Sequence, residues 1–138
     1  MTEEQHNRDK TAIAELIARY NFAIDHEDYQ GWADCFAPDG VFDGVIGKFD
    51  AHRELDRFTA EVKRLAAESP KLRHYVTNIL TEVDGDTARS KCFLLLTSTT
   101  KEGGSRVAMA GEYEDRLVKH EGQWLFSYRK VHIDGAMG

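Results

Sequence analysis

Apolar and polar positions follow two different periods along the chain, a helical one in the first half and a strand-like one in the second. Between residues 9 and 26, apolar residues recur three and four positions apart, which is typical of an amphipathic helix. The same spacing returns after Asp50, a candidate N-cap, and stops at Ser69-Pro70. The elements predicted for this half are a helix at 9–26, a short helix at 30–36, a short strand at 41–46 and a helix at 51–68.

From residue 71 onward the chain is rich in β-branched and aromatic residues, interrupted by turn-forming pairs such as Asp84-Gly85 and Glu121-Gly122. Such pairs favour tight hairpins, so we expect an antiparallel meander. Helices followed by strands predict an α+β fold, with N-terminal helices packed on a curved antiparallel sheet of four to six strands and a hollow between the two layers. The predicted strands lie at about 72–83, 87–100, 105–119 and 123–133.

Composition limits the class of protein and of partner. The 138 residues suit one domain, residues 1–138, and the net charge of −6 argues against nucleic acid, whose phosphates attract a basic face. No apolar run is long enough for a signal peptide or a membrane span, so we expect no membrane partner, a cytoplasmic location, and reduced, buried thiols at Cys35 and Cys92. The six histidines are scattered and no cofactor motif is present, so neither a metal nor a cofactor is expected.

The stretch KLRHYVTNIL, residues 71–80, reads as a strand that contains an imidazole and an amide. In a regular strand, Leu72, His74, Val76 and Asn78 share one face. That face is either half-wetted, or it is the apolar floor of a cavity with two polar groups pointing into it. In the second case His74 can act as a general base, because its ordinary pKa of about 6.5 lets it take and return a proton near neutral pH.

Three further ionisable residues lie in apolar segments. Asp25 closes the first predicted helix and can give His74 a carboxylate partner, although helical spacing places it off the apolar face. Tyr20 lies on that face, either as core packing or as a phenol that donates to a substrate oxygen. Arg129, in the last strand, either extends to the sheet edge or reaches into the hollow to hold an anion.

Alternation also predicts two faces for the last strand. The face of Arg129 also holds Leu125, Ser127, Val131 and Ile133. The opposite, amphipathic face is a candidate oligomer contact and holds Trp124, Phe126, Tyr128, Lys130 and His132.

The order of these residues resembles a known family. Tyr20 and Asp25 end the first helix, PDGVF follows the short second helix, RHYVTN opens the strands, and GEYEDRLVK and GQWLFSYRKV complete them. This arrangement, over about residues 8–133, resembles the SnoaL-like branch of the nuclear-transport-factor-like cone fold. That branch includes scytalone dehydratase, the lindane dehydrochlorinase and bile acid dehydratase, with ketosteroid isomerase more distant.

The resemblance implies a conical cavity and a mechanism without a cofactor. In the closer relatives an Asp at the end of the first helix orients a strand His that serves as base, which here corresponds to Asp25 and His74. A Tyr five residues before the Asp and an Arg in the last strand match Tyr20 and Arg129. Relatives form dimers or trimers, so a homo-oligomer is expected, with a trimer favoured. The second acid expected of ketosteroid isomerase is missing, which disfavours that mechanism.

Together these observations predict a cofactor-independent lyase or isomerase that dehydrates, or moves a double bond in, a small hydrophobic ring-type substrate. Two alternatives remain open: a non-catalytic module for small-molecule binding or dimerisation, and a polyketide cyclase with a similar acid–base centre. An enzyme requires His74 and Asp25 within hydrogen-bond reach beside an open pocket. The expected lining is Ile17, Tyr20, Trp32, Phe36, Val76 and Leu94, with Asn78 as a polar anchor.

Overall fold

A computed structural model describes residues 1–67 and 71–135, and it begins with two helices. Helix α1, Glu3–Asp25, starts six residues before the predicted position because Thr2 and Gln5 form a capping box. Its apolar stripe is buried against the sheet. Helix α2, Tyr29–Ala33, is short, and the carboxylate of Asp28 accepts a hydrogen bond from the backbone N–H of Gly31 at its start.

A hairpin and a third helix follow. Strand β1, Phe36–Gly44, is longer than predicted, and strand β2, Gly47–Asp50, lies where no strand was predicted. Helix α3, Leu55–Ala66, begins after the predicted position because Asp50 accepts the N–H groups of His52 and Arg53 in a turn instead of capping a helix. The predicted stop at Ser69-Pro70 lies outside the described residues.

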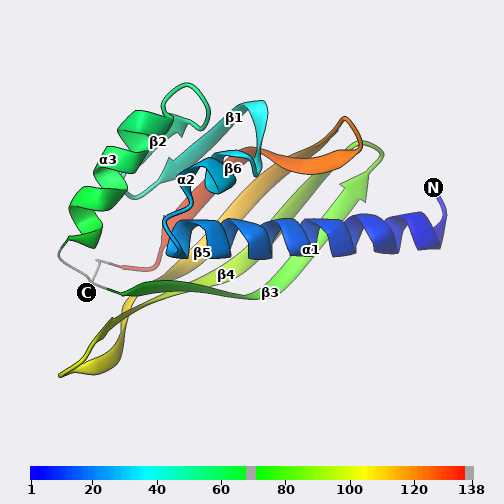
Figure 1. Cartoon of the computed structure of the whole chain (residues 1–138). Helices are drawn as coiled ribbons and strands as arrows, with labels where there is room; N and C mark the ends of the chain where they lie inside the picture. The colour runs from blue at the N-terminus through cyan, green and yellow to red at the C-terminus, as the bar shows by residue number, and fades with distance from the viewer. Residues whose placement is uncertain (68–70, 136–138) are drawn as a thin grey trace.

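Four long strands form the second half, at β3 (Leu72–Asp84), β4 (Thr87–Thr100), β5 (Gly104–His120) and β6 (Gln123–Ile133), close to their predicted bounds. The sheet has six strands in the order β2-β1-β6-β5-β4-β3. The predicted α+β class is confirmed, but the sheet is mixed rather than wholly antiparallel, because β1 pairs with β6 in parallel. Figure 1 shows α1 lying across one face of this sheet, with β2 and β3 as its open edges.

Two β-bulges change which side chains face the helices. In β3 the pairing with β4 shifts between Thr77 and Leu80, where Asn78 has a left-handed φ of 58°. In β6 the pairing with β5 shifts between residues 126 and 128, so Phe126 and Arg129 are both fully buried. Each bulge breaks the alternation on which the predicted faces depended.

Aromatic side chains fill the core between α1, α2, α3 and the sheet. The rings of Trp32 and Phe58 stack 3.7 Å apart, and this contact joins α2 to α3. At the other end of α1, Oδ1 of Asp9 accepts a hydrogen bond of 2.9 Å from the indole Nε1 of Trp124 on β6. This hydrogen bond and the buried apolar stripe of α1 hold the helix over the sheet, so that its last residue reaches β3. Among the described residues, no helix has the length and hydropathy needed to cross a membrane.

Candidate active site

Asp25 and His74 meet where α1 ends over β3. Nδ1 of His74 lies 2.6 Å from Oδ1 of Asp25, and the backbone N–H of His74 donates to Oδ2 at 2.9 Å. The carboxylate can accept from Nδ1 only if that nitrogen carries the proton, so the neutral ring keeps its lone pair on Nε2. Both side chains are largely buried, with exposed fractions of 17% for His74 and 13% for Asp25. The pair therefore has the geometry of an oriented base.

His74 lies in the wall of a cavity of about 380 Å³ between the sheet and the helices. This volume falls in the range of roughly 300–1,000 Å³ that is usual for small-molecule sites. Its walls are mostly apolar side chains from α1, α3 and the strands. Besides His74, the lining groups that carry polar atoms in their side chains are Tyr20, Arg106 and Tyr113. The cavity thus combines an apolar interior with a few polar groups.

Behind the deep wall of the cavity lies a buried ion pair. Nε of Arg129 is 3.0 Å from Oδ1 of Asp115, the residue directly opposite it on β5, and neither side chain is exposed. The Arg129 guanidinium faces the rings of Tyr20 and Tyr113, at 4.3 and 3.4 Å from their centroids. Burial raises the pKa of Asp115 to about 6, and the attraction of Arg129 opposes that rise.

The predicted site residues separate into three groups. His74, Tyr20 and Leu94 line the cavity, and Asp25 contacts His74. A second group belongs to the core rather than to the lining. Ile17, Trp32 and Phe36 are fully buried, and Val76 is half-buried at the edge of the core. The last group was placed wrongly by strand alternation. Asn78 is exposed outside the cavity because of its bulge, and Arg129 lies behind the tyrosines, not in the cavity.

The prediction that one face of β6 forms an oligomer contact was also wrong in part. Trp124 and Phe126 belong to the core, with exposed fractions of 4% and 0%, because the bulge turns Arg129 to the same side as these rings. Outside the bulge, Lys130 and His132 keep an outward orientation, and His132 bonds Glu114 on the neighbouring strand.

Two residues were missed by the reasoning from sequence, Tyr113 and Asp115. Both lie on β5 at alternate positions with Leu117, and all three are buried. A carboxylate in phase with buried apolar residues was the signal that could have found Asp115, since a buried charge needs a partner. Within the two described stretches, no group of three or more His, Cys, Asp or Glu residues is arranged to hold a metal ion.

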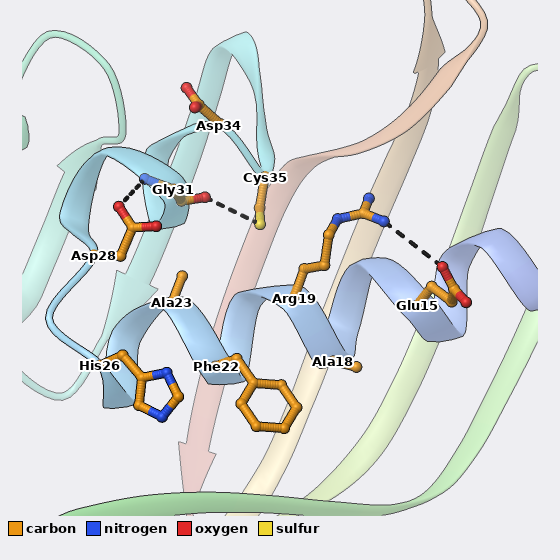
Figure 2. A pocket seen from close by; sticks show the side chains of 10 residues that line it. All are labelled: Glu15, Ala18, Arg19, Phe22, Ala23, His26, Asp28, Gly31, Asp34 and Cys35. Carbon is orange, nitrogen blue, oxygen red and sulfur yellow. Dashed lines mark hydrogen bonds and ion pairs between the residues drawn. The ribbon is translucent and has the colours of Figure 1, made fainter.

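A second, more open groove of about 590 Å³ lies between α1 and α2, on the outside of the molecule (Figure 2). Its polar groups are engaged locally: Arg19 forms an ion pair with Glu15, and the Cys35 thiol contacts the carbonyl oxygen of Gly31. Burial raises the pKa of Cys35 to about 11, so the thiol stays protonated and is a poor nucleophile. The Asp25–His74 pair, called the dyad below, presents His74 to the inner cavity, which is the stronger candidate site.

Comparison with known proteins places the chain. A model of the SnoaL-like domain matches residues 5–130. The chain belongs to the SnoaL-like domain family. The resemblance inferred from the sequence is therefore confirmed, and the family includes enzymes. Among curated protein sequences, none matches the chain significantly.

Solved structures with the same fold extend this result. Rv3472 from Mycobacterium tuberculosis, a protein of unknown function solved as an Asp-to-Asn variant, is 32% identical with a TM-score of 0.84, over 96% of this chain and 76% of that one. A protein of unknown function with a cystatin-like fold, from Nostoc punctiforme, is 23% identical, with a TM-score of 0.78 over 94% and 93% of the two chains. A Novosphingobium aromaticivorans protein provisionally named scytalone dehydratase is 20% identical, with a TM-score of 0.79 over 97% and 89%. At these last two identities the likeness establishes the SnoaL-like fold alone.

Proposed function

We propose that this SnoaL-like protein is a cofactor-independent lyase or isomerase in which His74 acts as the base. The imidazole Nε2 takes a proton from an acidic C–H next to a carbonyl, and the C–H electron pair moves into the ring system. In a dehydration the electrons expel a neighbouring hydroxyl group, which takes the proton from the imidazolium and leaves as water, so that His74 is neutral again. In an isomerisation the imidazolium returns the proton at another carbon.

The observation that carries this proposal is the 2.6 Å contact between Nδ1 of His74 and Oδ1 of Asp25, beside an apolar cavity. The carboxylate stabilises the imidazolium as it forms and holds the ring in one tautomer. A positioned base of this kind contributes about 10²–10⁴ to a rate. The contact favours an enzyme over a non-catalytic module, because a module that only binds a small molecule needs a cavity but no oriented base. A polyketide cyclase would use the same base, so the choice of reaction depends on the substrate.

The lining indicates a substrate that is apolar and about the size of a fused ring. Leu94, Leu96 and Met109 form the sheet side of the cavity, while Phe58 and Val62 of α3 cover it. Binding to such a lining is favoured by burial of the ligand's apolar surface, which contributes roughly 25 cal/mol for each Å² removed from water. Tyr20 offers a hydroxyl to an oxygen of the substrate.

A screen of ring hydroxy-ketones for loss of water, followed by ultraviolet absorbance of the conjugated product, tests the proposal. We expect turnover by the wild type and its loss in both His74→Ala and His74→Gln, with circular dichroism showing that each variant is folded. The exposed His120→Gln is the matched control and should keep full turnover. A His74→Ala protein with full turnover would end the proposal.

We also propose that the chain forms a homo-oligomer, with a trimer favoured, through the outer face of its sheet. Helices cover one face of the sheet, and the other carries exposed apolar side chains on neighbouring strands. Tyr75 on β3 pairs directly with Leu95 on β4, and Phe93 follows on the same face. The side chains of Tyr75, Leu95 and Phe93 remain 49%, 39% and 48% exposed. Because they are neighbours, they form a contiguous apolar patch, which is typical of an interaction surface.

A further inference from the structure

The deep wall of the cavity contains a second polar feature besides the dyad, a pair of phenols from different elements. Tyr20 comes from α1 and Tyr113 from β5, and their rings meet edge to face with centroids 5.9 Å apart. Both line the cavity, although they are only 2% and 1% exposed. Most of the lining around them is apolar, so these two hydroxyl groups dominate the polarity of the deep end.

The sheet register separates this pair from the base. His74 pairs with Leu96, Leu96 pairs with Met109, and Tyr113 follows Met109 by four residues on β5. At about 3.3 Å per residue, Tyr113 starts roughly 13 Å further along the sheet than the level of His74. Since side chains shorten that gap from both ends, a ring-sized molecule can lie between the imidazole and the phenols.

Both phenols keep their protons at physiological pH and can therefore donate. Burial raises the pKa of Tyr20 and raises that of Tyr113 well above its usual value, and in each case the positive charge of Arg129 opposes the rise. Each hydroxyl has one proton, so even if one phenol donates to the other, at least one O–H remains for a ligand.

Arg129 acts on this pair from behind. Its guanidinium lies over the ring faces of Tyr113 and Tyr20, and it forms a fully buried ion pair with its counter-charge, Asp115. A cation against the face of a phenol draws electron density from the ring and makes the O–H a stronger donor, and the low dielectric of the interior increases the effect. Arg129 is therefore a positioning and polarising residue that works through the tyrosines.

From this arrangement we propose that Tyr113 and Tyr20 form an oxygen-binding site for the carbonyl or phenolic oxygen of a ring-type ligand, strengthened by Arg129. The inference rests on the proposed function only for the choice of ligand class, since the base at His74 would take a proton from a carbon of the same ring system. A carbonyl oxygen has two lone pairs and can accept a hydrogen bond from each tyrosine hydroxyl, whereas an apolar or cationic group can accept none.

Equilibrium binding of 2-naphthol, compared with naphthalene, tests the site without relying on catalysis. Tyr113→Phe keeps the ring over Arg129 and removes only the hydroxyl. We expect it to weaken 2-naphthol binding about tenfold and to leave naphthalene binding within about twofold, because one buried hydrogen bond is lost. Tyr20→Phe should act in the same direction. Tyr75→Phe removes a hydroxyl from the exposed outer face and serves as the matched control, with unchanged binding of both compounds.

A second readout reports on charge at the oxygen. In the wild type, donation from the phenols should lower the pKa of bound 2-naphthol below that of the free compound, as measured by the absorbance of its anion against pH. The decrease should be smaller in Tyr113→Phe and in Arg129→Lys, which keeps the charge but loses the planar contact with the rings. A merely structural role for Tyr113 would leave this pKa unchanged.

The inference is overturned if Tyr113→Phe, shown to be folded by circular dichroism, binds 2-naphthol as tightly as the wild type, or if the wild type does not distinguish 2-naphthol from naphthalene. His74→Ala separates this result from the proposed function. The variant alters the cavity wall and can change the affinity for both compounds, but its preference for 2-naphthol over naphthalene should persist, because that preference depends on the phenols. Absence of catalysis alone therefore does not contradict the proposed oxygen-binding site. Failure to prefer 2-naphthol alone does not contradict the proposed role of His74 as the base.

Discussion

The carboxylate of Asp25 binds His74 twice, with Oδ1 2.6 Å from Nδ1 of the ring and Oδ2 2.9 Å from the backbone nitrogen. One oxygen thus fixes the imidazole and the other fixes the strand that carries it. Asp25 sits at the C-terminal end of α1, where the helix dipole disfavours an acid. The two hydrogen bonds from His74 offset that cost and explain why an acid occupies the position.

Asp25→Asn should disturb the tautomer of His74. The asparagine amide can donate to Nδ1, which moves the ring proton to Nε2 and removes the basic lone pair from the cavity. Nitrogen-15 NMR of the histidine ring should show protonated Nδ1 in the neutral wild type and a shift toward protonated Nε2 in the variant. Turnover should fall by about 10²–10⁴. Asp34→Asn alters an exposed carboxylate at the end of α2 and should change neither. An unchanged His74 tautomer in Asp25→Asn would contradict the assignment.

Asn78→Gly should leave ligand binding intact and keep or raise stability. Asn78 has a φ of 58° in the bulge of β3 and lies outside the cavity. Glycine adopts that conformation without steric cost, so we expect the free energy of unfolding in urea to rise by up to about 1 kcal/mol. Thr77→Gly, one residue earlier in regular strand, is the control and should lose about 0.5–1 kcal/mol. Weaker binding of 2-naphthol in Asn78→Gly would show that the amide does reach the ligand.

The buried carboxyl of Asp115 should make stability depend on pH. Its pKa is raised by burial from 3.8 to about 6, so the folded chain binds this proton more tightly than the unfolded chain does. As pH rises from about 4 to about 6, the contribution of Asp115 to the free energy of unfolding should therefore fall, and above that range it should stay constant. The change amounts to about 1.4 kcal/mol for each unit of pKa difference.

Urea unfolding of the wild type and Asp115→Asn across this range measures the effect. The variant lacks the titrating carboxyl, so its free energy of unfolding should improve relative to the wild type as pH rises to about 6. Because Arg129 loses its counter-charge in the variant, only the pH dependence of the difference is diagnostic. A difference that does not vary with pH would mean that Asp115 has an ordinary pKa.

The outer face of the sheet should control the oligomeric state. Phe93→Glu places a charge among exposed apolar side chains, which would cost several times the thermal energy if that face is buried between copies. We expect light scattering after size exclusion to report an oligomer, with a trimer favoured, for the wild type and a monomer for Phe93→Glu. Lys10→Glu, exposed on α1 at the opposite face of the sheet, is the control and should remain associated. A monomeric wild type would refute the oligomer.

Strand alternation and helical spacing could predict much of this molecule, because periodicity reports which face of a regular element is buried. His74 was correctly placed in the wall of a cavity, and the strands of the second half lie near their predicted bounds. Asp25 fell off the apolar stripe of its helix, and no local pattern could show that a strand histidine some fifty residues later would hold it there. Its role became visible through the family resemblance and the contact with His74.

What periodicity could not predict are the two bulges. A single extra residue reverses the faces beyond it, and neither Asn78 nor Ser127 lies in a sequence pattern that demands a bulge. Asn78 was therefore assigned to the cavity and Phe126 to an outer face. The same limit hid the surroundings of Arg129, since its partners Asp115 and Tyr113 come from β5 and Tyr20 from α1.

Proton exchange of a ring ketone tests the base most directly, because it requires no knowledge of the natural substrate. In deuterated buffer, the acidic C1 protons of 2-tetralone exchange with solvent, and proton NMR follows their loss with and without protein. The account predicts that the wild type accelerates exchange well above the buffer rate and that His74→Ala loses the protein-dependent rate by about 10²–10⁴. Exchange as fast with His74→Ala as with the wild type, or no acceleration by the wild type, would contradict it.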